Sequence, residues 1–318
     1  MNFINTDTPS IPKQKMYEYI WLLAGRNKIG KTTLGSNFPK PYFFTFEPGT
    51  SALLTYETDI LKTANKKNMH PWLVYKKAVD EFIKNNGYGF KTVVTDPYGV
   101  AYDKCEEFVC NKEGIDDPGD LDWGKGYRLV RKEFKKVTNK LISNQFTILF
   151  ITHIKAKNIK DGTGNEKDKL DLDISGQAGD FIRNLVDVFL LADFDEEGER
   201  KLFVRPTTNQ EAGSRLDFGN KTIDLNYKSL EKAFKEAIKK NNKKHGVTQE
   251  MIDNHYKKKE RENKLQKIQD KIINTAKQKG LTPDKNKEEM EEQIGHTSVK
   301  SIDDIEAAKK YLNYLQNK

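Results

Sequence analysis

Short apolar runs alternate with longer amphipathic segments over the first three quarters of the chain. Between Tyr127 and Ser143, apolar residues recur at the spacing of one helical face, which predicts a helix packed on a core. The alternation predicts an α/β domain whose mostly parallel sheet is covered by helices on both faces. The expected strands are 19–24, 42–46, 92–95, 147–152, 186–192 and 201–205, and the expected helices include 31–37, 72–84, 100–110 and 127–143.

The pattern changes after Lys240, where Lys, Glu, Asn and Gln dominate and aromatic residues become few. We therefore expect four parts: an N-terminal extension (1–16), the α/β domain (17–240), a charged helical linker (241–262) and a small helical domain (263–318). Two apolar stripes predict helices in the last part. One stops at Gly280 and the other follows a helix start at Ser301; their residues are Leu265, Ile268, Ile272, Ile273 and Ala276, then Ile305, Ala308, Tyr311, Leu312 and Leu315.

Composition limits where such a chain acts. Its only cysteines among 318 residues, Cys105 and Cys110, have no Cys or His partners at zinc-like spacing, so we expect two reduced thiols. The N-terminus lacks a basic-then-apolar leader, and no apolar run approaches the roughly 18 residues of a membrane span. We expect a cytoplasmic protein with no membrane partner.

The segment Gly25-Arg26-Asn27-Lys28-Ile29-Gly30-Lys31-Thr32 has the spacing G-x-x-x-x-G-K-T and follows an apolar strand. Glycines at both ends allow backbone N–H groups to turn inward around an anion. Lys31 would meet the β- and γ-phosphates, and the Thr32 hydroxyl would meet Mg²⁺. The segment predicts ATP and Mg²⁺ binding by Gly25, Asn27, Lys28, Ile29, Gly30, Lys31, Thr32 and Thr33.

Two acids follow short apolar runs. Asp96 ends the run 92–95, the strand-terminal position from which a carboxylate reaches Mg²⁺. Glu47 follows the run 42–46, and ligands in open α/β sheets lie beyond the carboxyl ends of the strands. We expect Asp96 to serve the metal and Glu47 to polarise the attacking water.

A histidine ends the strongly apolar strand at 147–152. His153 is placed to hydrogen-bond the γ-phosphate or a water and to report the nucleotide state to the segment that follows. That segment, Lys155 to Asn165, is polar, basic at first and glycine-bearing, which predicts a mobile loop suited to sequence-independent contact with a phosphate backbone.

An arginine from a neighbouring subunit often completes such a site. Arg205 and Arg215 flank the segment 206–214, and Arg215 lies in a turn of small residues that would project it outward. We expect Arg215 to act on the nucleotide of a neighbouring copy in a homo-oligomer.

The net charge of +8 is unevenly distributed. Residues 226–271 contain 14 Lys and Arg against 7 Asp and Glu. Such a stripe either meets nucleic acid phosphates or forms a solvated helix surface, and charge alone leaves both interpretations open.

Together these elements resemble the RecA-like P-loop ATPases encoded by bacteriophages, sometimes described as AAA-type phage nucleotide-binding proteins, including short recombinase paralogues. The resemblance covers about residues 17–240 and rests on 25–33, 46–49, 93–96, 151–153 and 213–215. It implies a catalytic role for Glu47, nucleotide sensing by His153 and a DNA-facing segment at 155–165. Phe46 stands where the family commonly has an acid or a small residue, and the Arg215 turn is less basic than usual.

The resemblance further implies single-stranded DNA and a phage single-strand-binding or annealing protein as partners, in recombination or replication. Two other functions remain open from the sequence: a helicase-loader-like ATPase that acts on a protein ring, and a nucleotide-bound interaction module with little turnover. A small-molecule kinase is disfavoured because no separate Arg-rich lid is evident.

Overall fold

The computed structural model describes residues 9–160, 166–174, 176–206 and 211–318. Their contacts divide the chain into two compact units. The larger unit spans Lys13–Lys244, and the smaller contains His245–Lys318 together with the described residues 9–12. In the described residues, no helix has the length and apolar character needed to cross a membrane.

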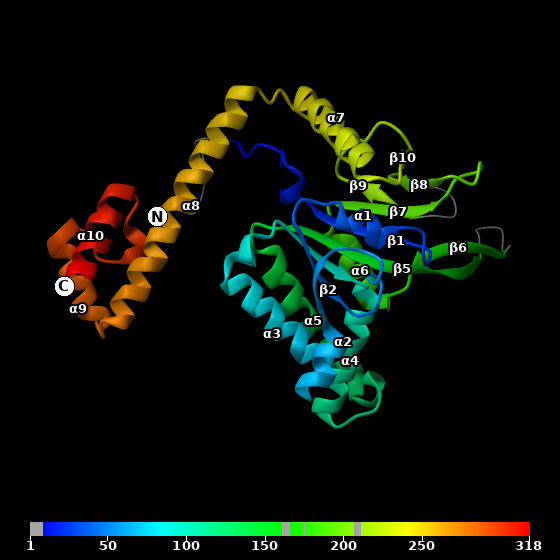
Figure 1. Cartoon of the computed structure of the whole chain (residues 1–318), viewed down its shortest axis with the longest axis horizontal. Helices are drawn as coiled ribbons and strands as arrows, with labels where there is room; N and C mark the ends of the chain where they lie inside the picture. The colour runs from blue at the N-terminus through cyan, green and yellow to red at the C-terminus, as the bar shows by residue number, and fades with distance from the viewer. Residues whose placement is uncertain (1–8, 161–165, 175, 207–210) are drawn as a thin grey trace. The chain divides into compact units, whose positions relative to one another are not determined.

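The larger unit is built on a twisted sheet with strand order β10-β8-β7-β1-β5-β4-β2-β3 (Figure 1). Strands β3, β2, β4, β5, β1 and β7 run parallel, whereas β8 and β10 are antiparallel additions; β6 pairs with β5 and β9 with β7. The strands are β1 (Ile20–Gly25), β2 (Pro41–Thr45), β3 (Tyr56–Asp59), β4 (Thr92–Asp96), β5 (Thr147–Lys160), β6 (Glu166–Leu172), β7 (Val188–Phe194), β8 (Arg200–Phe203), β9 (Gly213–Ser214) and β10 (Thr222–Asp224).

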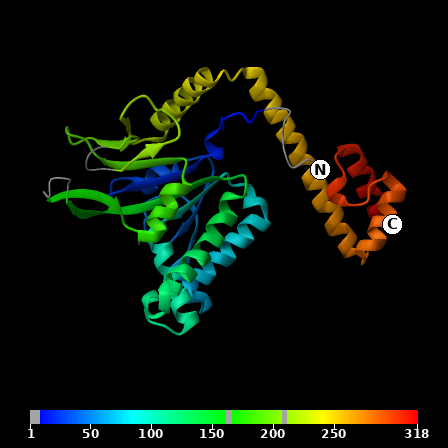
Figure 2. The same ribbon diagram turned by 180° about the vertical axis from the view of Figure 1, so that it is seen from behind.

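Helices cover both faces of this sheet (Figures 1 and 2). Core residues of α2 to α6 pack on one face, and those of α1 and α7 pack on the other. Because both faces are covered, strands such as β1, β4 and β7 are apolar almost throughout. The helices are α1 (Lys31–Ser36), α2 (Ile60–Lys67), α3 (Pro71–Lys84), α4 (Tyr98–Glu113), α5 (Lys125–Ile142), α6 (Gly176–Leu185) and α7 (Tyr227–His245). The predicted α/β class with a mostly parallel, doubly covered sheet is confirmed.

The smaller unit is helical and has its own core. It contains α8 (Gln249–Gln278), α9 (Pro283–Ile294) and α10 (Ile305–Asn317), with Ile272, Met290, Ile302 and Tyr311 among its buried residues. The expected stripe residues Ala276, Ala308 and Leu315 are also buried there. Thus the predicted C-terminal helical unit is confirmed as a fold element.

Two helix boundaries differ from expectation. Helix α8 continues without interruption through Glu262, because the sequence from Gln249 to Gln278 contains no glycine or proline and is rich in helix-forming residues. The last helix is capped by Asp304, whose carboxylate accepts a hydrogen bond from the backbone N–H of Ala307, and Ser301 lies in a preceding 3₁₀ turn.

The predicted mobile loop at 155–165 is wrong for its first half. Residues 155–160 extend β5 and pair with β6 as an antiparallel hairpin; 161–165 lie outside the described residues. Apolar residues alternate with charged ones along this hairpin, so Ile154 opposes Leu172 and Ala156 opposes Leu170. Lys157 ion-pairs with Asp171 across the strands at 3.4 Å. Cross-strand pairs of opposite charge favour a strand over a loop.

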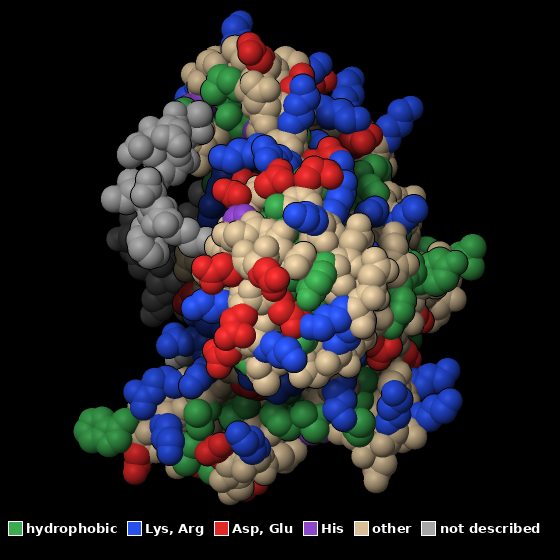
Figure 3. All heavy atoms as spheres, turned by 90° about the vertical axis from the view of Figure 1, so that its left-hand side faces the viewer, with side chains coloured by type: hydrophobic (Ala, Val, Ile, Leu, Met, Phe, Trp, Pro, Cys, Tyr) green, Lys and Arg blue, Asp and Glu red, His purple; other side chains and the backbone are tan. Residues whose placement is uncertain are grey.

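Figure 3 shows acidic and basic side chains intermingled on the surface that it draws.

Candidate nucleotide site

The register of the parallel strands places the predicted site residues at the same edge of the sheet. Gly25 at the end of β1 is opposite His153 of β5, and Thr45 at the end of β2 is opposite Asp96 of β4. These carboxyl ends of parallel strands meet where α1 begins, so residues far apart in the sequence converge there.

The phosphate loop joins β1 to α1 with a backbone that requires glycine. Gly30, which caps α1, has a φ of 114°, and Lys28 has a φ of 62°. At Gly25, a β-carbon would lie 2.5 Å from the carbonyl oxygen of Ala192 on the neighbouring strand. Glycine is therefore needed at 25 for close approach and at 30 for backbone conformation. The Ile29 side chain is buried in the core, so only its backbone is available to a ligand.

Lys31 is held inside the loop. Its ammonium group donates to the carbonyl oxygens of Gly25 at 2.9 Å and of Arg26 at 2.8 Å, and lies 3.4 Å from Nδ1 of His153. The residue is only 5% exposed. Burial lowers the pKa of Lys31 to about 8, against the opposing influence of Asp96 and Glu47. The lysine is therefore a desolvated cation whose charge an anionic ligand would stabilise.

Thr32 and Asp96 form the metal-side pair. The Thr32 hydroxyl donates to Oδ2 of Asp96 at 2.7 Å, and Asp96 is 6% exposed. Burial raises the pKa of Asp96, whereas the Thr32 hydrogen bond and Lys31 lower it. Gly49 leaves space beside them, because a β-carbon there would lie 3.2 Å from Oγ1 of Thr32 and 3.8 Å from Oδ2 of Asp96. The two oxygens suit a hard cation such as Mg²⁺, and the glycine keeps their surroundings open.

Glu47 and His153 form a second polar pair at the same edge. Oε2 of Glu47 lies 3.1 Å from Nε2 of His153, and the other ring nitrogen of His153 faces Lys31. A continuous polar contact therefore runs from Glu47 through His153 to the Lys31 ammonium. The preceding residue, Thr152, is completely buried, so only His153 of this dipeptide faces the site.

A cavity of about 680 Å³ contains most of these groups. Asn27, Lys28 and Thr33, which the sequence predicts to bind nucleotide, line it, and so do Pro48 and Asp173, which were not among the predicted residues. A second cavity of about 690 Å³ shares Gly30 and Thr33 with the first and extends past α1 to β8, β10 and the start of α7. Both volumes lie within the range of roughly 300–1,000 Å³ typical of ligand sites.

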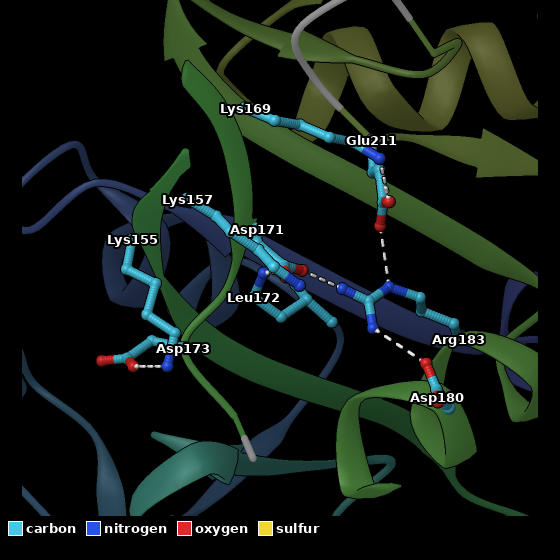
Figure 4. A network of polar contacts seen from close by, with 9 residues as sticks. All are labelled: Lys155, Lys157, Lys169, Asp171, Leu172, Asp173, Asp180, Arg183 and Glu211. Atoms are coloured by element: carbon cyan, nitrogen blue, oxygen red, sulfur yellow. Dashed lines mark hydrogen bonds and ion pairs between the residues drawn. The ribbon is translucent and has the colours of Figure 1, made fainter. Parts of the chain in front are cut away.

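The β5–β6 hairpin adjoins the first cavity through Asp173, and ion pairs anchor it (Figure 4). Lys155 reaches Asp173 at 3.0 Å, and Lys169 reaches Glu211 at 2.5 Å. Arg183 of α6 contacts Asp171, Glu211 and Asp180. Lys155, Lys157 and Lys169 therefore already have carboxylate partners.

Arg215 does not join this site. It is 67% exposed, and its Nε lies 3.5 Å from Oδ1 of Asp187, which immediately precedes β7. Asp187 also accepts from the backbone N–H of Ile20 at the start of β1, so Arg215 lies at the sheet edge opposite the phosphate loop. Arg205 ion-pairs with Asp217 instead.

Sequence reasoning also missed an ion pair between the phosphate loop and β7. Nε of Arg26 lies 2.8 Å from Oδ1 of the buried Asp193 near the end of β7. The available signal was an acid within the apolar run Val188–Phe194, because a buried carboxylate requires a partner.

The lowered pKa of Lys31 predicts a pH dependence for nucleotide binding. A bound polyphosphate favours the charged amine, so affinity should be greatest below pH 8 and fall up to about tenfold per pH unit above it. Equilibrium binding of a non-hydrolysable ATP analogue between pH 7 and 9.5 measures this. Lys31→Arg, whose guanidinium stays protonated, should lose the dependence. A constant wild-type affinity across this range would disprove the assignment.

Comparisons with known proteins identify the family of the chain. The model of a family described as AAA domain matches residues 18–216. No curated protein sequence matches the chain. One similar solved structure is described as a prototypical ATPase from the type III secretion system of pathogenic bacteria; it is 12% identical, with a TM-score of 0.38. That match covers 94% of this chain and 81% of the other. The family match spans more than half of the sequence, so this chain belongs to the AAA domain family of P-loop NTPases.

Proposed function

We propose that this protein is a Mg²⁺-dependent ATPase that binds single-stranded DNA and assists phage DNA recombination or replication as a homo-oligomer. The observation that carries the ATPase part is the convergence of Lys31, the Thr32–Asp96 pair and the Glu47–His153 pair on one cavity. A site that only binds phosphate does not need the last pair. Hydrolysis does, because the attacking water must be oriented.

Phosphates are expected to bind the backbone N–H groups at the start of α1 and the Lys31 ammonium. The positive end of the helix dipole and the inward-facing amides favour an anion there. Since the second cavity shares Gly30 and Thr33 with the first, it is the expected place for the nucleotide base, with Leu225 and Tyr227 as apolar contacts.

Magnesium fits the donor set on this chain. Thr32 and Asp96 supply a hydroxyl and a carboxylate 2.7 Å apart, next to the space left open by Gly49. When bound, the ion would neutralise phosphate charge. Within this pair, the carboxylate accepts a hydrogen bond from the Thr32 hydroxyl and thereby holds the hydroxyl in a fixed orientation.

Glu47 is the proposed acceptor of the proton from the attacking water. His153 orients the Glu47 carboxylate through Nε2 and faces Lys31 through Nδ1, so a change of charge near Lys31 would alter the contacts of His153. His153 also joins the hairpin, because its carbonyl oxygen accepts from the backbone N–H of Asp173 at 2.9 Å. This route would connect nucleotide state to the β5–β6 hairpin.

An assembly would explain the exposed Arg215. It points away from its own nucleotide site, and its weak 3.5 Å contact with Asp187 leaves the side chain two-thirds exposed. A neighbouring copy is the only place where it would meet a γ-phosphate, which supports a role in trans. The DNA and recombination parts of the proposal are supported by the resemblance of the motifs to phage RecA-like ATPases.

The test is a titration of the ATPase rate with single-stranded DNA at two salt concentrations. We expect stimulation that weakens steeply with salt, because phosphate contacts release counterions. Basal hydrolysis without stimulation by DNA would instead favour the helicase-loader-like function, with a protein as the activating partner. Nucleotide binding without hydrolysis under either condition would favour an interaction module and contradict the ATPase proposal.

A further inference from the structure

Helix α5 carries a concentration of positive charge that the nucleotide site does not use. Its 18 residues contain seven Lys and Arg and a single Glu. Because Val130, Phe134, Val137 and Leu141 pack into the core, the cations occupy the opposite face. These cations are Lys125, Arg128, Arg131, Lys132, Lys135, Lys136 and Lys140.

Few acidic side chains neutralise the positive charge of this face. Lys140 contacts Asp80 at 2.5 Å, and Lys135 lies 4.6 Å from the centre of the Phe181 ring. In the described part of the chain, the other five cations have no ion pair within 4 Å. Several are like-charged neighbours at i and i+4, such as Arg128 with Lys132 and Lys132 with Lys136, and such pairs destabilise a helix. Helix stability therefore does not explain this charge.

The position of the cations in the helix leads to the same conclusion. Lys125 and Arg128 occupy the first turns of α5, where the positive end of the helix dipole disfavours them. Helix α7 is also basic, but four of its seven lysines, at 239, 240, 243 and 244, lie in the last turns, where the dipole favours cations, and Lys235 ion-pairs with Glu231. Most of the charge of α7 thus has a structural explanation that the charge of α5 lacks.

A groove continues the basic face. Helices α3 and α5 lie side by side (Figures 1 and 2) and border a cavity of about 690 Å³. Lys84, Lys136 and Lys140 line it against one acid, Asp80, and the side chains of Asn139, Ser143 and Asn144 add neutral hydrogen-bonding groups. Such a lining complements phosphate oxygens.

We propose that the exposed face of α5 and the α3–α5 groove bind the phosphate backbone of single-stranded nucleic acid without reading its bases. From Lys125 to Lys140 the helix rises about 22 Å, enough to follow several consecutive phosphates. Membrane insertion is disfavoured because the apolar side of α5 is buried in the core. On the hairpin, Lys155, Lys157 and Lys169 are a poorer surface because each is already paired with a carboxylate.

This inference deepens the proposed function and rests on it for the choice of a single strand and for the expectation that the bound strand stimulates hydrolysis. The test measures binding of a fluorescein-labelled oligothymidylate by anisotropy over a range of salt. Arg128→Gln/Lys132→Gln/Lys136→Gln should weaken binding at least tenfold and make the log–log salt slope shallower by about 2, since each single-strand phosphate contact contributes about 0.7. Basal ATPase activity should not change, because none of these residues lines either nucleotide cavity.

The matched control is Lys232→Gln/Lys239→Gln/Lys243→Gln on α7, which removes the same charge and should bind like the wild type. Equal weakening in both variants, or no weakening in the α5 variant, would overturn the proposal. If the wild-type protein showed no basal ATPase activity, that result would contradict the proposed ATPase function and would leave the proposed binding surface on α5 unaffected.

The fluorescence of Trp123 tests where the strand binds and requires no mutation. It precedes α5 and is 94% exposed, whereas Trp21 and Trp72 are buried. The oligonucleotide should reduce acrylamide quenching of tryptophan fluorescence; unchanged quenching at saturation would exclude the beginning of α5 from the binding surface. Preferential binding of a duplex, or of phosphatidylserine vesicles, would replace the proposal with a different partner.

Discussion

Replacing Lys31 with alanine should reduce the ATPase rate about 100-fold or more and weaken nucleotide binding. The ammonium group is the one buried cation among the described residues of the phosphate loop, and its carbonyl partners hold it within the loop before any ligand binds. A preorganised charge in a desolvated site stabilises developing negative charge strongly, and loss of one such donor commonly costs about 10²–10³ in rate. Steady-state hydrolysis and equilibrium binding of an ATP analogue measure the two effects.

The matched control for this variant is Lys77→Ala, which removes an exposed lysine from the middle of α3. It should hydrolyse ATP like the wild type. Far-ultraviolet circular dichroism of both variants should match the wild type, since the Lys31 aliphatic stem is a small part of the core. Wild-type turnover in a folded Lys31→Ala protein would remove the phosphate loop from the mechanism.

Glu47→Gln should separate binding from hydrolysis. Glutamine keeps the size and hydrogen-bonding reach of the side chain but cannot accept a proton from water, so the rate should fall about 10²- to 10⁴-fold. Nucleotide affinity should stay within a few fold of the wild type, because Glu47 contacts His153 and does not belong to the phosphate loop. Single-turnover hydrolysis and analogue binding provide the measurements.

Glu57→Gln is the corresponding control, since Glu57 is an exposed residue of the edge strand β3. Its rate should equal that of the wild type. If Glu47→Gln also turned over at the wild-type rate, Glu47 would have no part in activating water, and another residue facing the same cavity, such as Asp173, would become the candidate.

Much of the sheet was predictable because its parallel strands are buried on both faces and are therefore continuously apolar. The run ending at Asp96 illustrates this: every residue of β4 is buried. The edge strand β3 and helix α2 were not predicted, because Tyr56–Asp59 is mostly polar and partly exposed and gives no apolar signal. The β5–β6 hairpin was missed because opposite charges on paired strands look like a polar loop when each strand is considered alone.

In the candidate site too, some residues could be predicted from the sequence and some contacts could not. Strand-end residues such as Glu47 and His153 were identifiable because a parallel sheet collects its carboxyl ends at one edge. Contacts that depend on register were not: the pairing of Arg26 with Asp193 requires β1 and β7 to be neighbours, which the sequence does not specify. The unbalanced charge of α5 became informative only when the groove beside α3 was known.

The most direct test of the central claim is a crystal structure with a non-hydrolysable ATP analogue and Mg²⁺. The account predicts phosphate oxygens within hydrogen-bonding distance of Lys31 Nζ and of the backbone N–H groups at the start of α1, with the metal beside Thr32 and Asp96. An analogue bound elsewhere on the protein, with the phosphate loop empty at saturating ligand, would contradict it.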